Sequence, residues 1–282
     1  MLEGVGEEGQ KKLLASRVLV VGAGGLGSPV LYYLAAAGVG RLGIVDSDRV
    51  DLSNLQRQII HFTSDLGRRK VESARDKLSA LNPRVGIDTY DMEITDEDSA
   101  KLVAEYDLVV MAVDNFSTRQ TLNKVCFTCG KPLIEGAVGG FSGHVTTFLP
   151  PTGPCYQCLF PKEDGEEQQK QPIHGRFAPA RTPSTAQEAS SGRRPRESRE
   201  YWGTVNNSRG EIKVLPEGVD SSAPGVIGAL PGVIGALQAG EALKVILGIG
   251  TPLLAKLLIF DFMKSEFRTL RYTRAQNCKV CR

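Results

Sequence analysis

The segment at residues 17–37 constrains the fold of this chain more strongly than any other. Residues 17–21 form a short apolar run, Arg-Val-Leu-Val-Val, whose β-branched side chains predict a buried parallel strand. The glycine-rich sequence Gly-Ala-Gly-Gly-Leu-Gly follows at 22–27, and residues 28–37 have the small and apolar side chains of a helix. A second apolar run at 41–46 ends in an aspartate. This order predicts a βαβ unit with a right-handed crossover.

Helix and strand patterns continue to alternate along the rest of the chain. We therefore expect an α/β fold, with a Rossmann-like, doubly wound and mostly parallel sheet and a mixed, antiparallel C-terminal part. The expected helices are 67–81, 115–129 and 224 to about 247, and the expected further strands are 107–113, 131–134, 144–149 (antiparallel), 257–262 and 267–272.

A polar segment interrupts this pattern. Residues 161–200 are rich in Gln, Arg, Glu, Pro and Ser, which predicts a mobile loop, and residues 201–215 suggest a hairpin around 206–210. We expect residues 1–282 to form a single domain, with 162–222 as a flexible insertion or crossover loop within it.

Composition and charge exclude several classes of protein. The 282 residues carry a formal net charge of +2, too close to neutral to indicate direct nucleic-acid binding. No window approaches the length of a membrane span, and the N-terminal residues lack the features of a signal peptide, so we expect a cytoplasmic protein without membrane association.

The glycine-rich loop predicts a site for a phosphate-bearing nucleotide. Gly22, Gly24, Gly25 and Gly27 allow a tight turn and a close approach of the backbone to phosphates, at a helix N-terminus with free N–H groups. Asp46, at the end of the second strand, would accept hydrogen bonds from ribose hydroxyls. A nicotinamide or flavin enzyme would have the same features.

The segment after the second strand separates these possibilities. It reads Asp-Leu-Ser-Asn-Leu-Gln-Arg-Gln at residues 51–58, and here the chain resembles the ThiF/MoeB/HesA family, bacterial relatives of ubiquitin-activating enzymes. The resemblance covers most of the chain except about 162–222. Its other motifs are VGAGGLGS, GRRKVESARDKL, the AVDN stretch with Arg119, and LPGVIG near the C-terminus.

The resemblance implies an ATP- and Mg²⁺-dependent adenylyltransferase. Such enzymes adenylate the C-terminal glycine carboxylate of a small ubiquitin-like protein and release pyrophosphate, and cations must bring the two anionic reactants together. The resemblance assigns Arg57, Lys70 and Asp114 to catalysis, Asp114 as the Mg²⁺ ligand, and it assigns nucleotide contacts also to Asp46, Asn54 and Asn115. The alternative is that Arg57 and Lys70 are solvated cations and that Asp114 caps a helix.

Four of the six cysteines form two Cys-x-x-Cys pairs far apart in the sequence. Cys155 and Cys158 form one pair and Cys278 and Cys281 the other, and each can supply two thiolates to a tetrahedral ion. The resemblance implies that the pairs meet around one structural Zn²⁺; the alternative is two separate pairs of free thiols. The third pair, 126 and 129, falls within an expected helix, where we expect core cysteines.

Two features depart from the family pattern. Many members have a cysteine shortly before the Gly-Val-Ile-Gly segment, where an ungapped match puts Ser221, a poor substitute for a thiolate. Members also usually begin with a segment whose arginine reaches the triphosphate bound to the partner subunit, and we expect no such segment before residues 6–13 here. We therefore expect adenylation without a covalent transfer step, with sulfur delivered by a sulfurtransferase or cysteine desulfurase.

The expected partners are a β-grasp carrier protein ending in Gly-Gly and a second copy of the chain, because the resemblance implies a homodimer. Three alternatives remain open on the residues alone. They are adenylation of a small or tRNA-bound carboxylate, a degenerate module that binds nucleotide or carrier without catalysis, and a nicotinamide dehydrogenase, which would not explain residues 51–58.

Overall fold

The computed structural model describes residues 5–161, 204–207, 210–213 and 225–282. Its strands are β1 (Arg17–Val21), β2 (Arg41–Val45), β3 (Gly86–Tyr90), β4 (Leu108–Met111), β5 (Leu133–Gly139), β6 (Ser142–Phe148), β7 (Thr204–Asn207), β8 (Gly210–Lys213), β9 (Lys256–Asp261) and β10 (Glu266–Arg271). Its helices are α1 (Gly6–Ala15), α2 (Gly27–Ala37), α3 (Lys70–Leu81), α4 (Asp96–Ala104), α5 (Phe116–Thr128), α6 (Tyr156–Leu159) and α7 (Ala229–Leu247), with short 3₁₀ helices η1 (Leu52–Asn54) and η2 (Thr63–Asp65).

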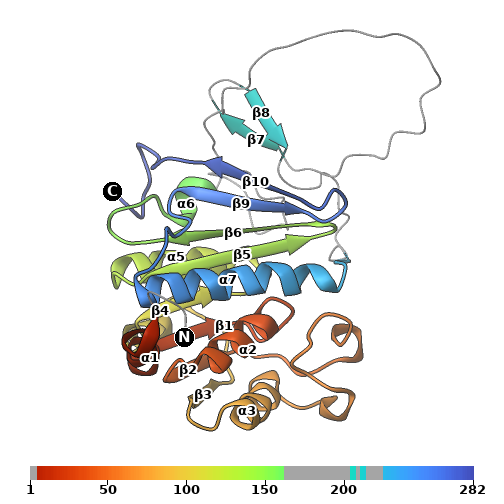
Figure 1. The fold of residues 1–282 in the computed structure, drawn as a ribbon. Helices are drawn as coiled ribbons and strands as arrows, with labels where there is room; N and C mark the ends of the chain where they lie inside the picture. The colour runs from red at the N-terminus through yellow and green to blue at the C-terminus, as the bar shows by residue number, and fades with distance from the viewer. Residues whose placement is uncertain (1–4, 162–203, 208–209, 214–224) are drawn as a thin grey trace, which may run out of the picture.

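Eight strands form one sheet in the order β10-β9-β6-β5-β4-β1-β2-β3 (Figure 1). Strands β3, β2, β1, β4 and β5 are parallel, and β6, β9 and β10 continue the sheet in antiparallel pairs. The expected fold class is confirmed, including the antiparallel C-terminal part. Strands β7 and β8 pair separately as an antiparallel hairpin, as the sequence predicted.

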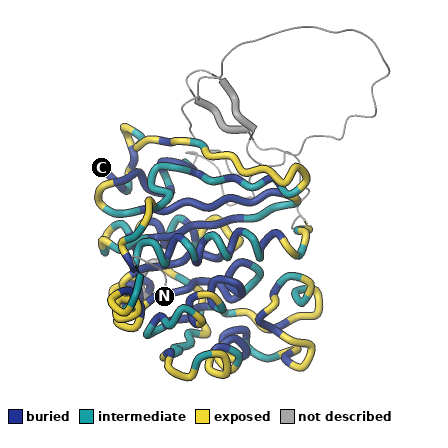
Figure 2. The backbone as a smooth tube through the Cα atoms, viewed as in Figure 1, coloured by how far each residue is buried: buried dark blue, intermediate teal, exposed yellow. Residues whose placement is uncertain are grey.

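Side chains along the central strand β1 point alternately to the two faces of the sheet, and each face has its own hydrophobic core. Val18 and Val20 pack with α2, α3 and α7 on one face of the sheet. Leu19 and Val21 pack with α4, α5 and α6 on the other. Figure 2 shows that the central strands are buried along most of their length, whereas the two ends of the sheet are more exposed. The strand pattern is therefore continuously apolar because both faces are covered.

The C-terminal helix α7 begins later than the sequence predicted. Residue 226 forms an isolated β-bridge to Gly140, so the chain is still extended there and turns helical only at Ala229. By length and composition alone, this helix could cross a membrane, because its mean hydropathy over 18 residues is 1.4. The expectation that no window approaches this length is thus wrong. Half of that window is buried inside the protein, where α7 packs on α2, β5 and β6.

Other expected boundaries shift for local reasons. The helix expected at 67–81 begins at Lys70, because Gly67 has a φ of +80° and Arg69 forms a bridge to Arg49. Helices α1 and α4 and strand β3 were not predicted. The loop expected at 161–200, the insertion expected at 162–222 and the position of Ser221 lie almost entirely outside the described residues.

Candidate functional site

The candidate site lies where the direction of chain winding reverses in the sheet. From β1 the chain moves outward to β2 and β3, and it then returns to the other side of β1 as β4. The carboxyl ends of β1, β2 and β4 therefore lie next to one another, and each is followed by one of the predicted site segments. Open α/β sheets bind ligands in the crevice at this point.

The glycine-rich loop is the tightest turn in the site. Gly22 has a φ of +101°, and a Cβ there would lie 2.4 Å from the carbonyl oxygen of Ala112, just beyond β4. A Cβ on Gly27 would lie 1.9 Å from the carbonyl oxygen of Gly22, so any larger residue would break the turn. Gly24 and Gly25 face the next motif, since added Cβ atoms would lie 3.5 Å from Gln58 Nε2 and 3.4 Å from Arg57 Cγ.

Asp46 joins the glycine-rich loop to the end of β2. Its Oδ2 accepts a hydrogen bond of 2.8 Å from the Ala23 amide, and its Oδ1 accepts one of 2.9 Å from the Asp48 amide. A carboxylate has about four lone-pair positions, so these two bonds leave it able to accept from ribose hydroxyls as well.

The segment after β2 positions the predicted Asn54 and Arg57. Asp51 caps η1, accepting bonds from the amide and hydroxyl of Ser53, and these bonds lower the pKa of Asp51. The backbone carbonyl of Asn54 then accepts hydrogen bonds from the backbone amides of Arg57 and Gln58. The Arg57 guanidinium donates to the Ser53 carbonyl at 3.1 Å and has no carboxylate partner among the described residues. Its charge is therefore not neutralised within the described part of the chain.

Lys70 is the first residue of α3, and its ammonium group forms an ion pair with the exposed carboxylate of Asp48. Its Nζ lies 2.7 Å from Asp48 Oδ2, with 6% of the lysine side chain exposed against 68% of the aspartate. The interaction thus directs a largely buried cation toward the end of β2, next to Asp46.

Asp114 and Asn115 follow β4 and have different local roles. Asn115 caps α5, because its Oδ1 accepts a 2.8 Å bond from the Thr118 amide. The alternative that Asp114 is the helix cap is therefore wrong. Asp114 is exposed and has no hydrogen bond or ion pair with any other described residue, which leaves its carboxylate available for a hard cation.

Sequence reasoning missed His61, which lies beneath the glycine-rich loop. The ring is buried, and burial lowers its pKa. Its Nε2 lies 2.9 Å from the Ala23 carbonyl, which can only accept, so the neutral ring donates there and accepts at Nδ1 from Ser73 Oγ, also at 2.9 Å. His61 thereby connects the loop to α3. A single histidine in an apolar sequence gives no signal of such a role.

The four predicted metal ligands meet in one buried cluster. Cys155 Sγ lies 3.5 Å from Cys278 Sγ, and Cys158 Sγ lies 3.2 Å from Cys281 Sγ. All four sulfurs lie within 4.8 Å of one another. Four thiolates at about 2.3 Å from a tetrahedral Zn²⁺ are about 3.8 Å apart, so the cluster could bind this ion. The alternative of two unlinked pairs is excluded by these distances.

The surroundings of the cluster favour one thiolate, that of Cys158, whereas hydrogen bonding to Cys158 raises the pKa of Cys155 and burial raises the pKa of Cys281. Asn123 on α5 donates to Cys155 Sγ at 3.7 Å, and the Ala275 amide donates to Cys158 Sγ at 3.3 Å. Hydrogen bonding from the Cys155 thiol, together with the Ala275 amide, lowers the pKa of Cys158. In contrast, Cys126 lies in the core, where burial raises its pKa, as expected for an inert thiol.

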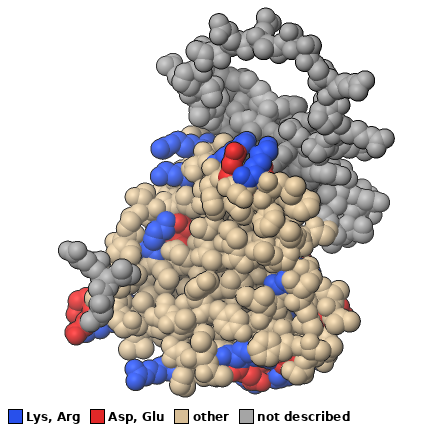
Figure 3. All heavy atoms as spheres, turned by 45° about the vertical axis from the view of Figure 1, so that its right-hand side comes forward, with Lys and Arg blue, Asp and Glu red and all other residues tan. Residues whose placement is uncertain are grey.

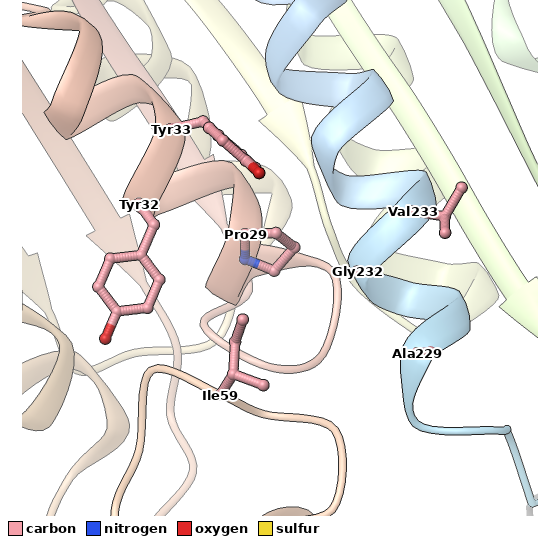
Figure 4. A pocket seen from close by; sticks show the side chains of 7 residues that line it. All are labelled: Pro29, Tyr32, Tyr33, Ile59, Ala229, Gly232 and Val233. Atoms are coloured by element: carbon pink, nitrogen blue, oxygen red, sulfur yellow. The ribbon is translucent and has the colours of Figure 1, made fainter.

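A separate apolar pocket opens beside the glycine-rich loop, between α2 and α7 (Figure 4). Its volume is about 410 Å³, and its lining has no charged residue: Pro29, Tyr32, Tyr33, Ile59, Ala229, Gly232 and Val233. A broad face on this side of the molecule is largely free of charged side chains, which gather at its margins (Figure 3). The lining offers nothing to bind a triphosphate, so this pocket is distinct from the predicted nucleotide site.

The comparisons with family models and with known proteins point to the same family. The chain matches the model of the ThiF family over residues 1–280. It is similar to the sulfur carrier protein adenylyltransferase of Thermus thermophilus, with 41% identity over 286 residues, covering 100% of this chain and 88% of that protein. It is also similar to the SAMP-activating enzyme E1 of Haloferax volcanii, with 40% identity over 281 residues, covering 100% and 86%.

A solved structure supports the fold. The crystal structure of Escherichia coli MccB with MccA-N7isoASN superimposes with a TM-score of 0.71 at 21% identity, covering 97% of this chain and 69% of that chain. The matched sequence and the matched architecture agree along nearly the whole length of the chain. The chain belongs to the ThiF family.

Proposed function

We propose that this protein is an ATP-dependent adenylyltransferase that activates the C-terminal glycine carboxylate of a small sulfur-carrier or ubiquitin-like protein. The observation that carries the proposal is a pair of opposite charges at the switch point that have no ion-pair partner among the described residues. These charges belong to Arg57 and Asp114, which lie on the two sides of the glycine-rich turn. The names of the two relatives, both enzymes that act on small proteins, support the same reaction.

The residues of the site have complementary roles in this proposal. Gly22, Gly24, Gly25 and Gly27 let the backbone approach the phosphates at the N-terminus of α2. Asp46 holds the ribose, Asn54 lies beside the phosphates, and Arg57 and Lys70 bind the triphosphate, Arg57 with a fork suited to two oxygens. Asp114 binds Mg²⁺, and Asn115 fixes the turn that carries it.

The reaction forms one P–O bond at the α-phosphorus and breaks another. A carboxylate oxygen of the carrier's terminal glycine attacks the α-phosphorus of ATP, the bond to the bridging oxygen breaks, and pyrophosphate leaves with the electron pair. Both reactants are anions, so Arg57 and Lys70 stabilise the charge that collects on the phosphate oxygens. The bound Mg²⁺ supplies further neutralisation of the triphosphate. Because Asp48 holds Lys70 in the free protein, the triphosphate replaces or shares this partner on binding.

The test is ATP–pyrophosphate exchange with Mg²⁺ and a β-grasp carrier that ends in Gly-Gly. We expect carrier-dependent exchange, reduced to background by Asp114→Ala, which removes the proposed Mg²⁺ ligand, and by about 100-fold by Lys70→Ala, which removes a cation that stabilises the transition state. Lys11→Ala and Glu8→Ala, at an exposed pair on α1, are matched controls and should not change the rate. The absence of carrier-dependent exchange with every carrier tried would refute the proposal.

We also propose that the sulfur itself comes from another protein, a sulfurtransferase or a cysteine desulfurase. Serine stands at position 221, where many members of the family have a cysteine, and the serine hydroxyl is not ionised at neutral pH and is a poor nucleophile there. The Thermus relative is named for a sulfur carrier, which agrees with an activated carboxylate that is later converted to a thiocarboxylate.

We propose that the four-cysteine cluster holds one structural Zn²⁺ and that the protein is a homodimer. The buried cluster of four sulfurs supports the metal, because four cysteines close a tetrahedral site without an open position. The apolar lining of the pocket between α2 and α7, within a face that is largely free of charged side chains, supports the dimer, because exposed apolar surface can mark protein–protein contacts.

A further inference from the structure

A buried arginine ties together the ends of β4 and β5 directly beside the candidate site. Strands β4 and β5 pair up to Met111 and Glu135, and beyond this point β4 leaves the sheet. Arg119, on the first turn of α5, donates from Nη2 both to the carbonyl of Val113 and to that of Gly136, the latter at 3.2 Å. Its side chain therefore replaces the hydrogen bonding that the two strands lose.

The charge of Arg119 is neutralised inside the protein. Its Nη1 forms an ion pair with Glu135 Oε1, and both side chains are buried. Glu135 Oε2 also lies 3.2 Å from His144 Nε2. Burial alone would raise the pKa of Glu135, but the neighbouring His144 ring and the Arg119 guanidinium hold it below its usual range. The carboxylate thus stays ionised and fixes the guanidinium in one orientation.

Asp114 lies between two fixed points. On one side, the Val113 carbonyl is held by Arg119. On the other, Asn115 is held by its cap to the Thr118 amide, on the same turn of α5. The backbone of Asp114 is therefore clamped, while its side chain remains exposed and without a partner among the described residues.

We propose that Arg119 is a positioning residue for the Mg²⁺-bound nucleotide: it fixes the turn at Val113 so that Asp114 presents its carboxylate to the metal. This inference rests on the proposed function, in which Asp114 is the Mg²⁺ ligand. Arg119 can reach three acceptors at once because its donors form a planar fork. A lysine would keep the charge but not this geometry.

The test compares the Kd for ATP measured by calorimetry in saturating Mg²⁺ and in EDTA. Residues that orient a metal ligand typically contribute 10- to 100-fold to metal affinity, so Arg119→Lys should reduce the Mg²⁺-dependent gain in ATP affinity by about this factor. The Kd in EDTA should change little, because Arg119 is buried and its donors are occupied by Glu135, Val113 and Gly136. Arg41→Lys, at a half-buried ion pair with Asp88, is the matched control and should keep the full gain.

A double-mutant cycle with Asp114→Asn separates positioning from general loss of structure. If Arg119 acts through Asp114, then Arg119→Lys should cause no further loss of the Mg²⁺-dependent gain in the Asp114→Asn protein. Additive losses, or an unchanged gain in a folded Arg119→Lys protein, would overturn the inference. Circular dichroism and thermal melting establish that each variant is folded.

A charge-balanced variant covers the case in which Arg119→Lys does not fold. Arg119→Gln combined with Glu135→Gln removes the ion pair without leaving one buried charge alone. This double variant should lose the same part of the Mg²⁺-dependent gain in ATP affinity. If it kept the full gain of the wild-type protein, the inference would also be overturned. A wild-type protein that binds no ATP would instead overturn the proposed function.

Discussion

At the scale of single residues, His61 shows how the glycine-rich loop depends on a neutral ring. Protonation of the ring would put a proton on Nδ1, which accepts from Ser73 Oγ, and would put a charge into a buried site. Burial accordingly lowers the pKa of His61 in the folded protein. An unfolded histidine has a pKa of about 6.5.

This shift predicts a loss of stability in mild acid. Below pH of about 6.5 the unfolded chain binds a proton that the folded protein does not, so the free energy of unfolding falls as pH decreases toward the folded pKa. The slope for one such proton is at most about 1.4 kcal/mol per pH unit. Urea unfolding between pH 7.5 and 5 measures this slope.

The variant His61→Gln isolates the contribution of this ring. Glutamine can donate to the Ala23 carbonyl and does not titrate, so it should flatten the pH dependence between pH 7 and 5. If wild type and variant lose stability with the same slope, the effect does not come from His61.

Some of the predicted site residues could be placed from local sequence and others only from the family resemblance. Asp46 follows an apolar strand, so its position can be read from the neighbouring residues, whereas Asn115 came from the resemblance, and the pattern had suggested Asp114 as the helix cap. The partners of those residues could not be found in this way. The contact between Arg119 and Gly136 depends on how β4 and β5 meet in space, which the sequence does not state.

At the scale of elements, the four-cysteine cluster joins the short helix α6 to the C-terminal segment. We expect about one Zn²⁺ per chain in protein purified without chelators, measured by mass spectrometry of the metal. Removal of the ion should lower the melting temperature, because a ligand at 100 times its Kd stabilises the folded state by about 2.7 kcal/mol. Cys278→Ser should lose the metal.

Cys129→Ser is the control for this experiment, because Cys129 is the C-cap residue of α5 and lies outside the cluster, so this variant should leave the zinc content unchanged. Well under one zinc per chain in the wild type, with no change in melting temperature on chelation, would show that the cysteines hold no structural ion.

Two of the elements that sequence reasoning missed, α1 and β3, have little buried apolar surface. Helix α1 buries only Gly9 and Leu13 and is mostly polar elsewhere, so its pattern resembles a loop. Strand β3 lies at an edge and has no fully buried residue, and its sequence Gly-Ile-Asp-Thr-Tyr does not alternate clearly. The central strands were predicted because they are buried on both faces and therefore have uninterrupted apolar sequences.

At the scale of the whole molecule, the uncharged face predicts self-association. Tyr33 and Ile59 are each 55% exposed and line the apolar pocket between α2 and α7. Light scattering during size-exclusion chromatography should give twice the mass of one chain. Ile59→Glu should shift the protein toward the mass of one chain, because burying an unpaired charge in an apolar interface is costly.

Phe267→Glu provides the matched control, since Phe267 is 53% exposed but lies on β10 at the far end of the sheet. It should leave the mass unchanged. A wild-type mass of one chain at all concentrations, or equal effects of the two substitutions, would argue against an interface on the α2–α7 face.

Strand β10 also affects whether the protein aggregates through the edge of its sheet. It is the last strand of the described sheet, and an edge of this kind has unpaired backbone groups that can recruit a strand from another chain. Charged residues occupy half of its six positions, Glu266, Arg268 and Arg271. A strand that approached this edge would have to desolvate these charges, so the sheet ends in a barrier against aggregation.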